Sequence, residues 1–313
     1  MTHLGKWLRG GLLFLTLGGF LQCSSGTPDS ACAETAAQYC AAYDRCFAGQ
    51  TQALFGDAAT CQARFALACK NEFFAPSTTA TPESVVQCGK EIAGLQCGQD
   101  FGEARSCAPA GQLAAGAACG SDSQCLSTQC RKTNSSGCGT CVARAKVGES
   151  CSSTSCEFGL TCGFQGGSQA KCVAAVAVGG ACGAGSLCQT GSECISSVCT
   201  KISYGAEGAA CGGAGMASCN PQQNLACNTM TKKCEAPKFV AAGEVCGTLA
   251  SGGRAICTGG GSCKIMQGSA NTGVCVAAAK DGAACDESQS ISCLAPASCL
   301  AGTCQLPNAS ACK

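Results

Sequence analysis

A chain of 313 residues with 35 cysteines and 43 glycines, but only 12% charged residues, departs from the composition of an ordinary globular protein. Its 20 basic and 19 acidic residues nearly cancel, which argues against a nucleic-acid partner captured through a strongly basic surface. A cysteine content above about 8–10% is typical of disulfide scaffolds from oxidising compartments. We therefore predict a small disulfide-rich fold, in which covalent bridges replace much of the hydrophobic burial.

Residues 1–22 have the layout of a secretory signal peptide. Lys6 and Arg9 precede an uncharged run from Gly11 to Leu21. This run is too short to span a bilayer, since a spanning helix needs about 20 apolar residues. The sequence therefore predicts export of the mature chain.

Cys23 stands at the end of the apolar run and makes the cysteine count odd. We predict that it carries a lipid after cleavage, and that residues 23–30 form a tether to the outer membrane or cell surface. The alternative is ordinary cleavage after Gly26, which would remove Cys23 and yield a soluble secreted or periplasmic protein. Both outcomes leave an even number of cysteines.

Residues 31–110 follow a helical pattern and predict a disulfide-stapled three-helix bundle. The stretch ACAETAAQYCAAYDRCF places its cysteines and aromatic residues on one helical face. Asp57 is suited to cap a second helix, and Thr81 a third. Cys61 and Cys69 lie about 12 Å apart along a helix, too far to bond each other, because bridged Cα atoms lie within about 7 Å. The same holds for Cys32 and Cys40, so these thiols must reach other helices.

Residues 116–313 form a tandem repeat, in which a glycine stands three residues before a cysteine, as in GAAC, GESC and GGAC. Most units hold four cysteines and are too small to fold by hydrophobic burial alone, so we predict loop and β-hairpin modules closed by two bridges each. Of the three possible pairings, we favour first with third and second with fourth. The first unit has a fifth cysteine, and the last unit contains the extra Cys312. Without Cys23, the remaining cysteines could form 17 bridges. The units are 116–147, 148–178, 179–207, 208–242, 243–281 and 282–313.

The helical region, followed by GAACGSDSQCLSTQCRKTNSSGCGTC and the serial GxxC units, resembles the cysteine-rich exported lipoproteins of myxobacterial type. The repeats of those proteins resemble the Dickkopf N-terminal cysteine-rich domain. The resemblance covers most of the mature chain and implies a surface or periplasmic protein. It carries no binding residues over, because only the cysteine framework matches.

Few residues favour catalysis. The single histidine is His3, inside the signal segment, which excludes histidine-dependent triads and histidine-ligated metal sites from the mature chain. The C-x-x-C motif from Cys138 to Cys141 lacks the context of a redox or zinc site, and CTGGGSCK lacks the full phosphate-loop pattern. The neighbouring carboxylates are Asp286 with Glu287 and Asp100 with Glu103. We expect no catalytic residue, cofactor or metal.

Three functions follow as hypotheses. The first is a non-catalytic envelope protein, whose array acts as a semi-rigid stalk or multi-loop surface for an unknown protein or envelope polymer. It would contact the membrane through its N-terminal lipid. The second is a secreted protease inhibitor that presents Arg131 or Lys132 from the loop CRKTNSSGC. The third, and least favoured, is a cell-envelope enzyme.

Overall fold

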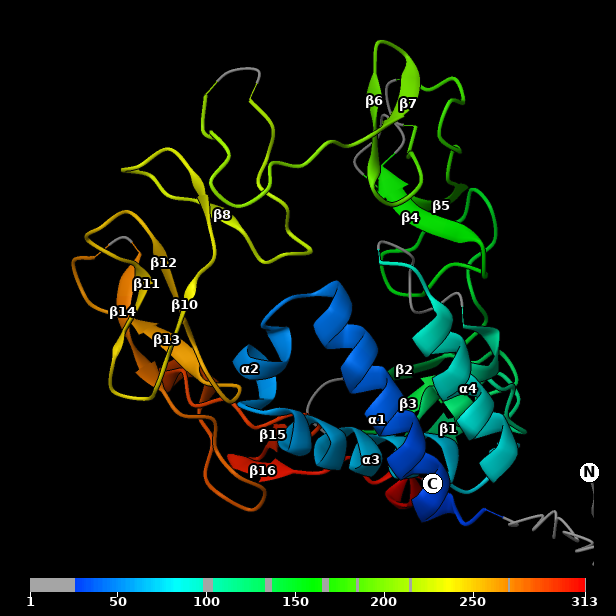
Figure 1. Ribbon diagram of the computed structural model, residues 1–313. Helices are drawn as coiled ribbons and strands as arrows, with labels where there is room; N and C mark the ends of the chain where they lie inside the picture. The colour runs from blue at the N-terminus through cyan, green and yellow to red at the C-terminus, as the bar shows by residue number, and fades with distance from the viewer. Residues whose placement is uncertain are drawn as a thin grey trace, which may run out of the picture.

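The computed structural model describes residues 26–97, 104–132, 137–164, 169–183, 186–213, 216–269 and 271–312. A helical region is followed by a series of short hairpins that passes around it and returns (Figure 1). The C-terminus therefore lies beside the helices from which the chain set out (Figure 1).

The described residues form four α-helices rather than the three predicted. The additional helix has six residues between Gly49 and Gly56, too few to show a helical periodicity in the sequence. Asp57 caps the third helix by accepting a hydrogen bond from the backbone N–H of Thr60, and Thr81 caps the fourth, as predicted. The helices are α1 (Pro28–Cys46), α2 (Gln50–Phe55), α3 (Ala58–Phe73) and α4 (Pro82–Gly94).

Helix α1 packs against both α3 and α4, and disulfides hold it there. Two bridges, Cys32–Cys69 and Cys40–Cys61, join α1 to an antiparallel α3, which confirms that neither helix bridges its own cysteines. On the other side the Thr35 hydroxyl donates to the Val85 carbonyl at 2.7 Å. Val85 is fully buried, so the helical region has a small apolar core of its own. Two further bridges close this region, Cys46–Cys97 and Cys88–Cys107.

All 34 cysteines after Cys23 form 17 disulfides. In the five units from the second to the sixth, the first cysteine bonds the third and the second bonds the fourth, which confirms the predicted pairing. Cys182–Cys194 and Cys188–Cys199 are one example. The third and fourth cysteines lie opposite each other in the unit's hairpin, as Cys194 and Cys199 do. Each unit thus fastens both strands of a hairpin to its own first half.

The strands of the first three units are β1 (Ala118–Cys119), β2 (Cys130–Lys132), β3 (Gly139–Cys141), β4 (Leu160–Phe164), β5 (Ala170–Ala174), β6 (Ser192–Ile195) and β7 (Val198–Lys201). Those of the last three are β8 (Ala226–Cys227), β9 (Cys234–Glu235), β10 (Lys238–Val240), β11 (Val245–Thr248), β12 (Arg254–Cys257), β13 (Ser262–Ile265), β14 (Thr272–Val276), β15 (Ser298–Leu300) and β16 (Thr303–Gln305). The first unit forms a sheet in the order β1-β3-β2. The fifth unit and β10, from the end of the fourth, form a five-stranded sheet in the order β10-β12-β11-β14-β13.

Backbone conformation explains why each GxxC opening begins with glycine. All six adopt φ between 78° and 90°, a backbone conformation that residues other than glycine rarely adopt. This turn directs the glycine N–H to the carbonyl of the cysteine in the second strand of the unit's hairpin, at 2.7–2.9 Å in all six units. An added Cβ would meet no atom within 4 Å, so backbone conformation and not crowding requires glycine. The six are Gly116, Gly148, Gly179, Gly208, Gly243 and Gly282.

The array is closed into a ring by a bridge between its first and last units. Cys138, the fourth of the five cysteines of the first unit, bonds Cys312 across 174 residues. Beside this bridge, Gly120 packs so closely on Ala309 that an added Cβ would lie 2.4 Å from its Cα. The two cysteines that broke the repeat pattern are therefore partners of each other.

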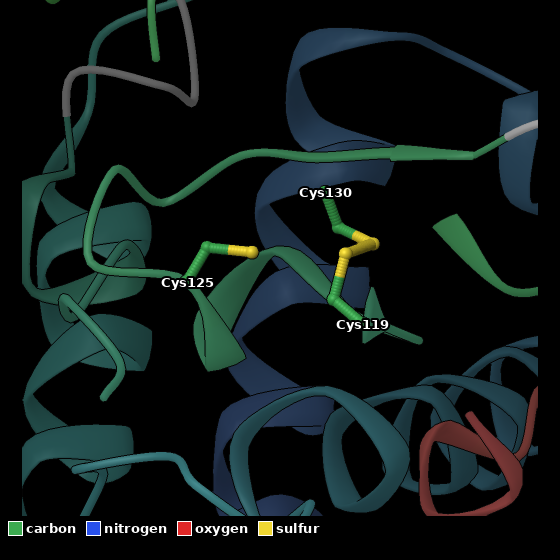
Figure 2. Close-up of side chains that lie close together, drawn as sticks. All are labelled: Cys119, Cys125 and Cys130. Carbon is green, nitrogen blue, oxygen red and sulfur yellow. A yellow bond between two sulfur atoms is a disulfide. The ribbon is translucent and has the colours of Figure 1, made fainter. Parts of the chain in front are cut away.

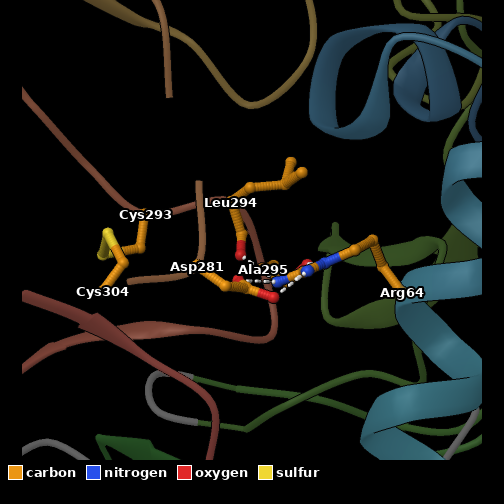
Figure 3. Close-up of polar contacts among 6 residues, drawn as sticks. All are labelled: Arg64, Asp281, Cys293, Leu294, Ala295 and Cys304. Carbon is orange, nitrogen blue, oxygen red and sulfur yellow. Dashed lines mark hydrogen bonds and ion pairs between the residues drawn. A yellow bond between two sulfur atoms is a disulfide. The ribbon is translucent and has the colours of Figure 1, made fainter. Parts of the chain in front are cut away.

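Arg64 of α3 anchors the last unit to the helical region (Figure 3). Its guanidinium donates to both carboxylate oxygens of Asp281, at 2.6 and 2.8 Å. It also donates to the carbonyls of Leu294 and Ala295, at 2.8 and 2.7 Å. The Arg64 side chain is only 11% exposed, so this contact is largely shielded from water.

The fifth unit is attached through α2. The N–H groups of Gly259 and Gly260, in the turn between β12 and β13, donate to the carbonyls of Gln52 and Ala53. The array therefore contacts the helical region and its own beginning as well as its neighbouring units.

We expect the Cys138→Ser/Cys312→Ser variant to open the ring. Loss of this bridge should lower the free energy of unfolding by about 2–4 kcal/mol, because the unfolded chain gains freedom. The radius of gyration from X-ray scattering should rise. The matched control, Cys182→Ser/Cys194→Ser, removes a bridge inside one unit and should leave the overall dimensions near those of the parent protein. An unchanged radius for the first variant would contradict a closing role.

Replacing Arg64 with methionine should release the last unit from α3. Four hydrogen bonds to a shielded guanidinium are lost, so we expect about 2 kcal/mol less stability. Hydrogen exchange should accelerate in residues 281–300. Lys70→Met on the same helix removes an exposed ion pair with Asp29 and should change stability by less than about 0.5 kcal/mol. Equal effects of the two substitutions would argue against the anchor.

The same contact should make stability depend on acid pH. Arg64 lowers the pKa of Asp281 below its ordinary value by hydrogen bonding, with a smaller contribution from its charge. The charged form is favoured in the folded state, so its contribution is present above the unfolded pKa of about 3.9 and is lost as the pH falls through the lower folded pKa. The stability difference between the parent and Asp281→Asn, measured by denaturant unfolding, should therefore shrink from pH 7 towards about pH 2.5. A constant difference would rule out this linkage.

Candidate binding groove

The cysteine clusters of the units are structural. In the first unit the sulfur atoms of Cys119, Cys125 and Cys130 lie within 4.8 Å of one another, as thiolate metal ligands would. Cys119 is bonded to Cys130 (Figure 2), and Cys125 is bonded to Cys141. Disulfide sulfurs are not thiolates, so these clusters offer no metal ligand set in the oxidised protein.

Several residues singled out in the sequence have structural partners. The C-x-x-C cysteines do not bond each other, since Cys138 bonds Cys312 and Cys141 bonds Cys125. The Asp286 carboxylate accepts from the N–H and hydroxyl of Ser288, and these bonds lower its pKa, which does not suit a general acid. In CTGGGSCK, the N–H groups of Gly259 and Gly260 donate to α2, and that of Gly261 donates to the Thr258 carbonyl within the turn. Asp100 and Glu103 lie outside the described residues.

Two kinds of site were predicted from the sequence, a lipidation site and an inhibitor loop. Cys23 lies outside the described residues, so its lipidation stays a prediction. Arg131 and Lys132 are exposed in β2, where their backbones pair with Thr140 and Gly139 of β3. Insertion of Arg131 or Lys132 into a protease also stays a prediction. Both residues belong to strand β2, and residues 133–136 of the loop lie outside the described residues.

A groove of about 1240 Å³ runs between the end of the helical region and the first three units. The 3-10 helix η2 (Arg105–Cys107) forms one wall, and residues 151–162 of the second unit form much of another. No motif marked this groove in the sequence, because its walls come from four separate segments. Hydroxyl and amide side chains line much of it, among them Gln129, Ser153, Thr154, Thr161, Gln189 and Thr190.

Two guanidinium groups meet at one aromatic ring inside this groove. Arg105 and Arg144 each lie 4.2 Å from the centroid of the Phe158 ring. Such stacking orients a guanidinium and is worth about 0.5–2 kcal/mol. The ring therefore holds two positive charges near each other despite their mutual repulsion.

The two arginines differ in their remaining partners. Arg144 donates to the carbonyls of Ser127, Thr128 and Cys156 and to the Thr128 hydroxyl, so its donors are used within the protein. Among the described residues, no oxygen accepts a hydrogen bond from the Arg105 guanidinium, which is exposed. Arg105 is thus positioned in the groove with no oxygen acceptor for its guanidinium in the described part of the chain.

The electrostatics of the groove favour a negatively charged group. Burial is the main cause that lowers the pKa of Arg144, and the positive charge of Arg105 lowers it further against the opposing effect of Asp122. Glu157 is the one acidic residue among the described lining residues. An anion bound beside Arg105 would reduce the repulsion between the guanidiniums and accept its free donors.

No protein-family model, curated protein or solved structure matched this chain. Its many disulfides indicate an extracellular or cell-envelope protein, because reducing compartments do not maintain them. Among the described residues, no helix has both the length and the apolar character that crossing a bilayer requires.

Proposed function

We propose that this protein is a non-catalytic interaction module of the cell envelope, and that its groove binds an acidic envelope polymer. The observation that carries the proposal is Arg105, held in place by Phe158 with no protein acceptor among the described residues. The groove is large enough for an extended chain, and its hydroxyl and amide groups can exchange hydrogen bonds with sugar hydroxyls. A carboxylated polysaccharide fits this combination.

The closed ring supports a binding role. A binding surface built from four segments keeps its shape only when those segments are held relative to one another. The disulfides within each unit and the Cys138–Cys312 bridge provide this restraint, which lowers the ordering cost of binding.

Attachment to the outer membrane or cell surface through a lipid on Cys23 is part of the proposal. It is supported by the position of Cys23 after an apolar run and by the resemblance to exported cysteine-rich lipoproteins. Fatty-acid labelling that persists unchanged in Cys23→Ala would contradict it.

Binding to polygalacturonate, a carboxylated polysaccharide, tests the groove. The purified oxidised protein should bind it in a co-sedimentation assay and should not bind neutral dextran. Arg105→Gln should weaken binding about tenfold, the equivalent of about 1.4 kcal/mol for a lost charged hydrogen bond. Arg254→Gln, an exposed arginine of β12 outside the groove, is the matched control and should have no effect. Equal binding to both polymers, or an equal loss in both variants, would overturn the proposal.

A further inference from the structure

A second hollow, separate from the groove, lies where the ring closes on the helical region. It has a volume of about 360 Å³ and is bounded by α1, α3 and α4, by the first unit and by the last unit. Its walls are mainly apolar and include Tyr39, Phe65, Phe73, Ile92, Pro296 and Pro307. A mostly apolar hollow of this size with a few polar groups is typical of a small-molecule site.

Tyr39 is a partly buried aromatic residue in the wall of this cavity. Tyr39 and Phe65 pack with their ring centroids 4.1 Å apart. Burial, with a smaller contribution from Tyr43, raises the pKa of Tyr39 to about 12. A ligand that entered the cavity would therefore exchange water for hydrocarbon contacts.

Two oppositely charged side chains line the cavity, one from the helical region and one from the first unit. Glu72 of α3 accepts a hydrogen bond from the backbone N–H of Ser123 at 3.0 Å, and burial raises the pKa of its carboxyl. The negative charge of Asp122, which is not part of the lining, raises this pKa further, and the positive charge of Lys132, in the first unit, lowers it. Because the lining holds one charge of each sign, a ligand with a net charge would place an uncompensated charge in an apolar hollow.

The size and the polar pair define a ligand class. A water-sized group occupies about 30 Å³ in a liquid, so the volume corresponds to about a dozen non-hydrogen atoms. A hydroxyl both donates and accepts, so it can donate to a carboxylate and accept from an ammonium group. We propose that this cavity binds a neutral hydrocarbon alcohol, with its chain among the aromatic and proline side chains and its hydroxyl between Glu72 and Lys132.

Isothermal titration calorimetry with 1-decanol, decanoate and decylammonium tests this proposal on the purified oxidised protein, below the solubility limit of 1-decanol and the micellar concentrations of the two ions. The three share a chain and differ in head-group charge. We expect 1-decanol to bind and the two ions to bind at least about tenfold more weakly. Equal binding of all three, or no binding of 1-decanol, would overturn the assignment.

Substitutions locate the site. Ala68→Trp on α3 fills the cavity and should abolish 1-decanol binding, whereas Ala63→Trp, on the exposed face of the same helix, should not. Undiminished binding to Ala68→Trp would place the alcohol elsewhere.

Charge variants test the polar end even if the tryptophan variant does not fold. Glu72→Gln leaves Lys132 unbalanced, so decanoate should gain affinity relative to 1-decanol. Lys132→Met leaves Glu72 unbalanced, so decylammonium should gain instead. Unchanged selectivity in both variants would show that these two residues do not contact the head group. The proposal is independent of polysaccharide binding in the groove, which Arg105→Gln reports separately.

Discussion

The bridge between Cys138 and Cys312 imposes the constraint on which the arrangement of the whole molecule depends. Each unit of the array is closed by its own two disulfides, so its internal fold does not require its neighbours. A string of such units has many possible paths. Joining the first unit to the last across 174 residues removes most of them. Arg64 and α2 then determine how the closed array lies against the helices.

The helical region acts as the hub of this ring. Helix α3 is fastened to α1 by two disulfides, contacts the last unit through Arg64 and contacts the first through Glu72. The groove and the apolar cavity both occur where array and hub meet. Neither could form within one unit, because a hairpin with two crossed disulfides has too little apolar surface to enclose a hollow of hundreds of cubic ångströms.

The polar groups that might have supported catalysis have structural roles instead. Asp286 caps a turn, Asp281 holds Arg64, and Gly259 and Gly260 donate to a helix. Arg105 is different, since its only described side-chain partner is an aromatic ring. A guanidinium that is oriented by stacking and has no acceptor among the described residues is suited to recognition of an anion.

The sequence by itself determined the local structure of this protein. The repeat predicted small hairpin modules with four cysteines and left three pairings open, and the favoured one, first with third and second with fourth, is the one that forms. Helical periodicity and the caps at Asp57 and Thr81 predicted α1, α3 and α4, whereas six-residue α2 left no periodic signal. Only the tertiary structure decided that Cys138 and Cys312 are partners, that Arg64 binds Asp281, and that Arg105 meets Phe158. These contacts join residues far apart in the chain, and their formation depends on the path of the whole array, which no local pattern encodes.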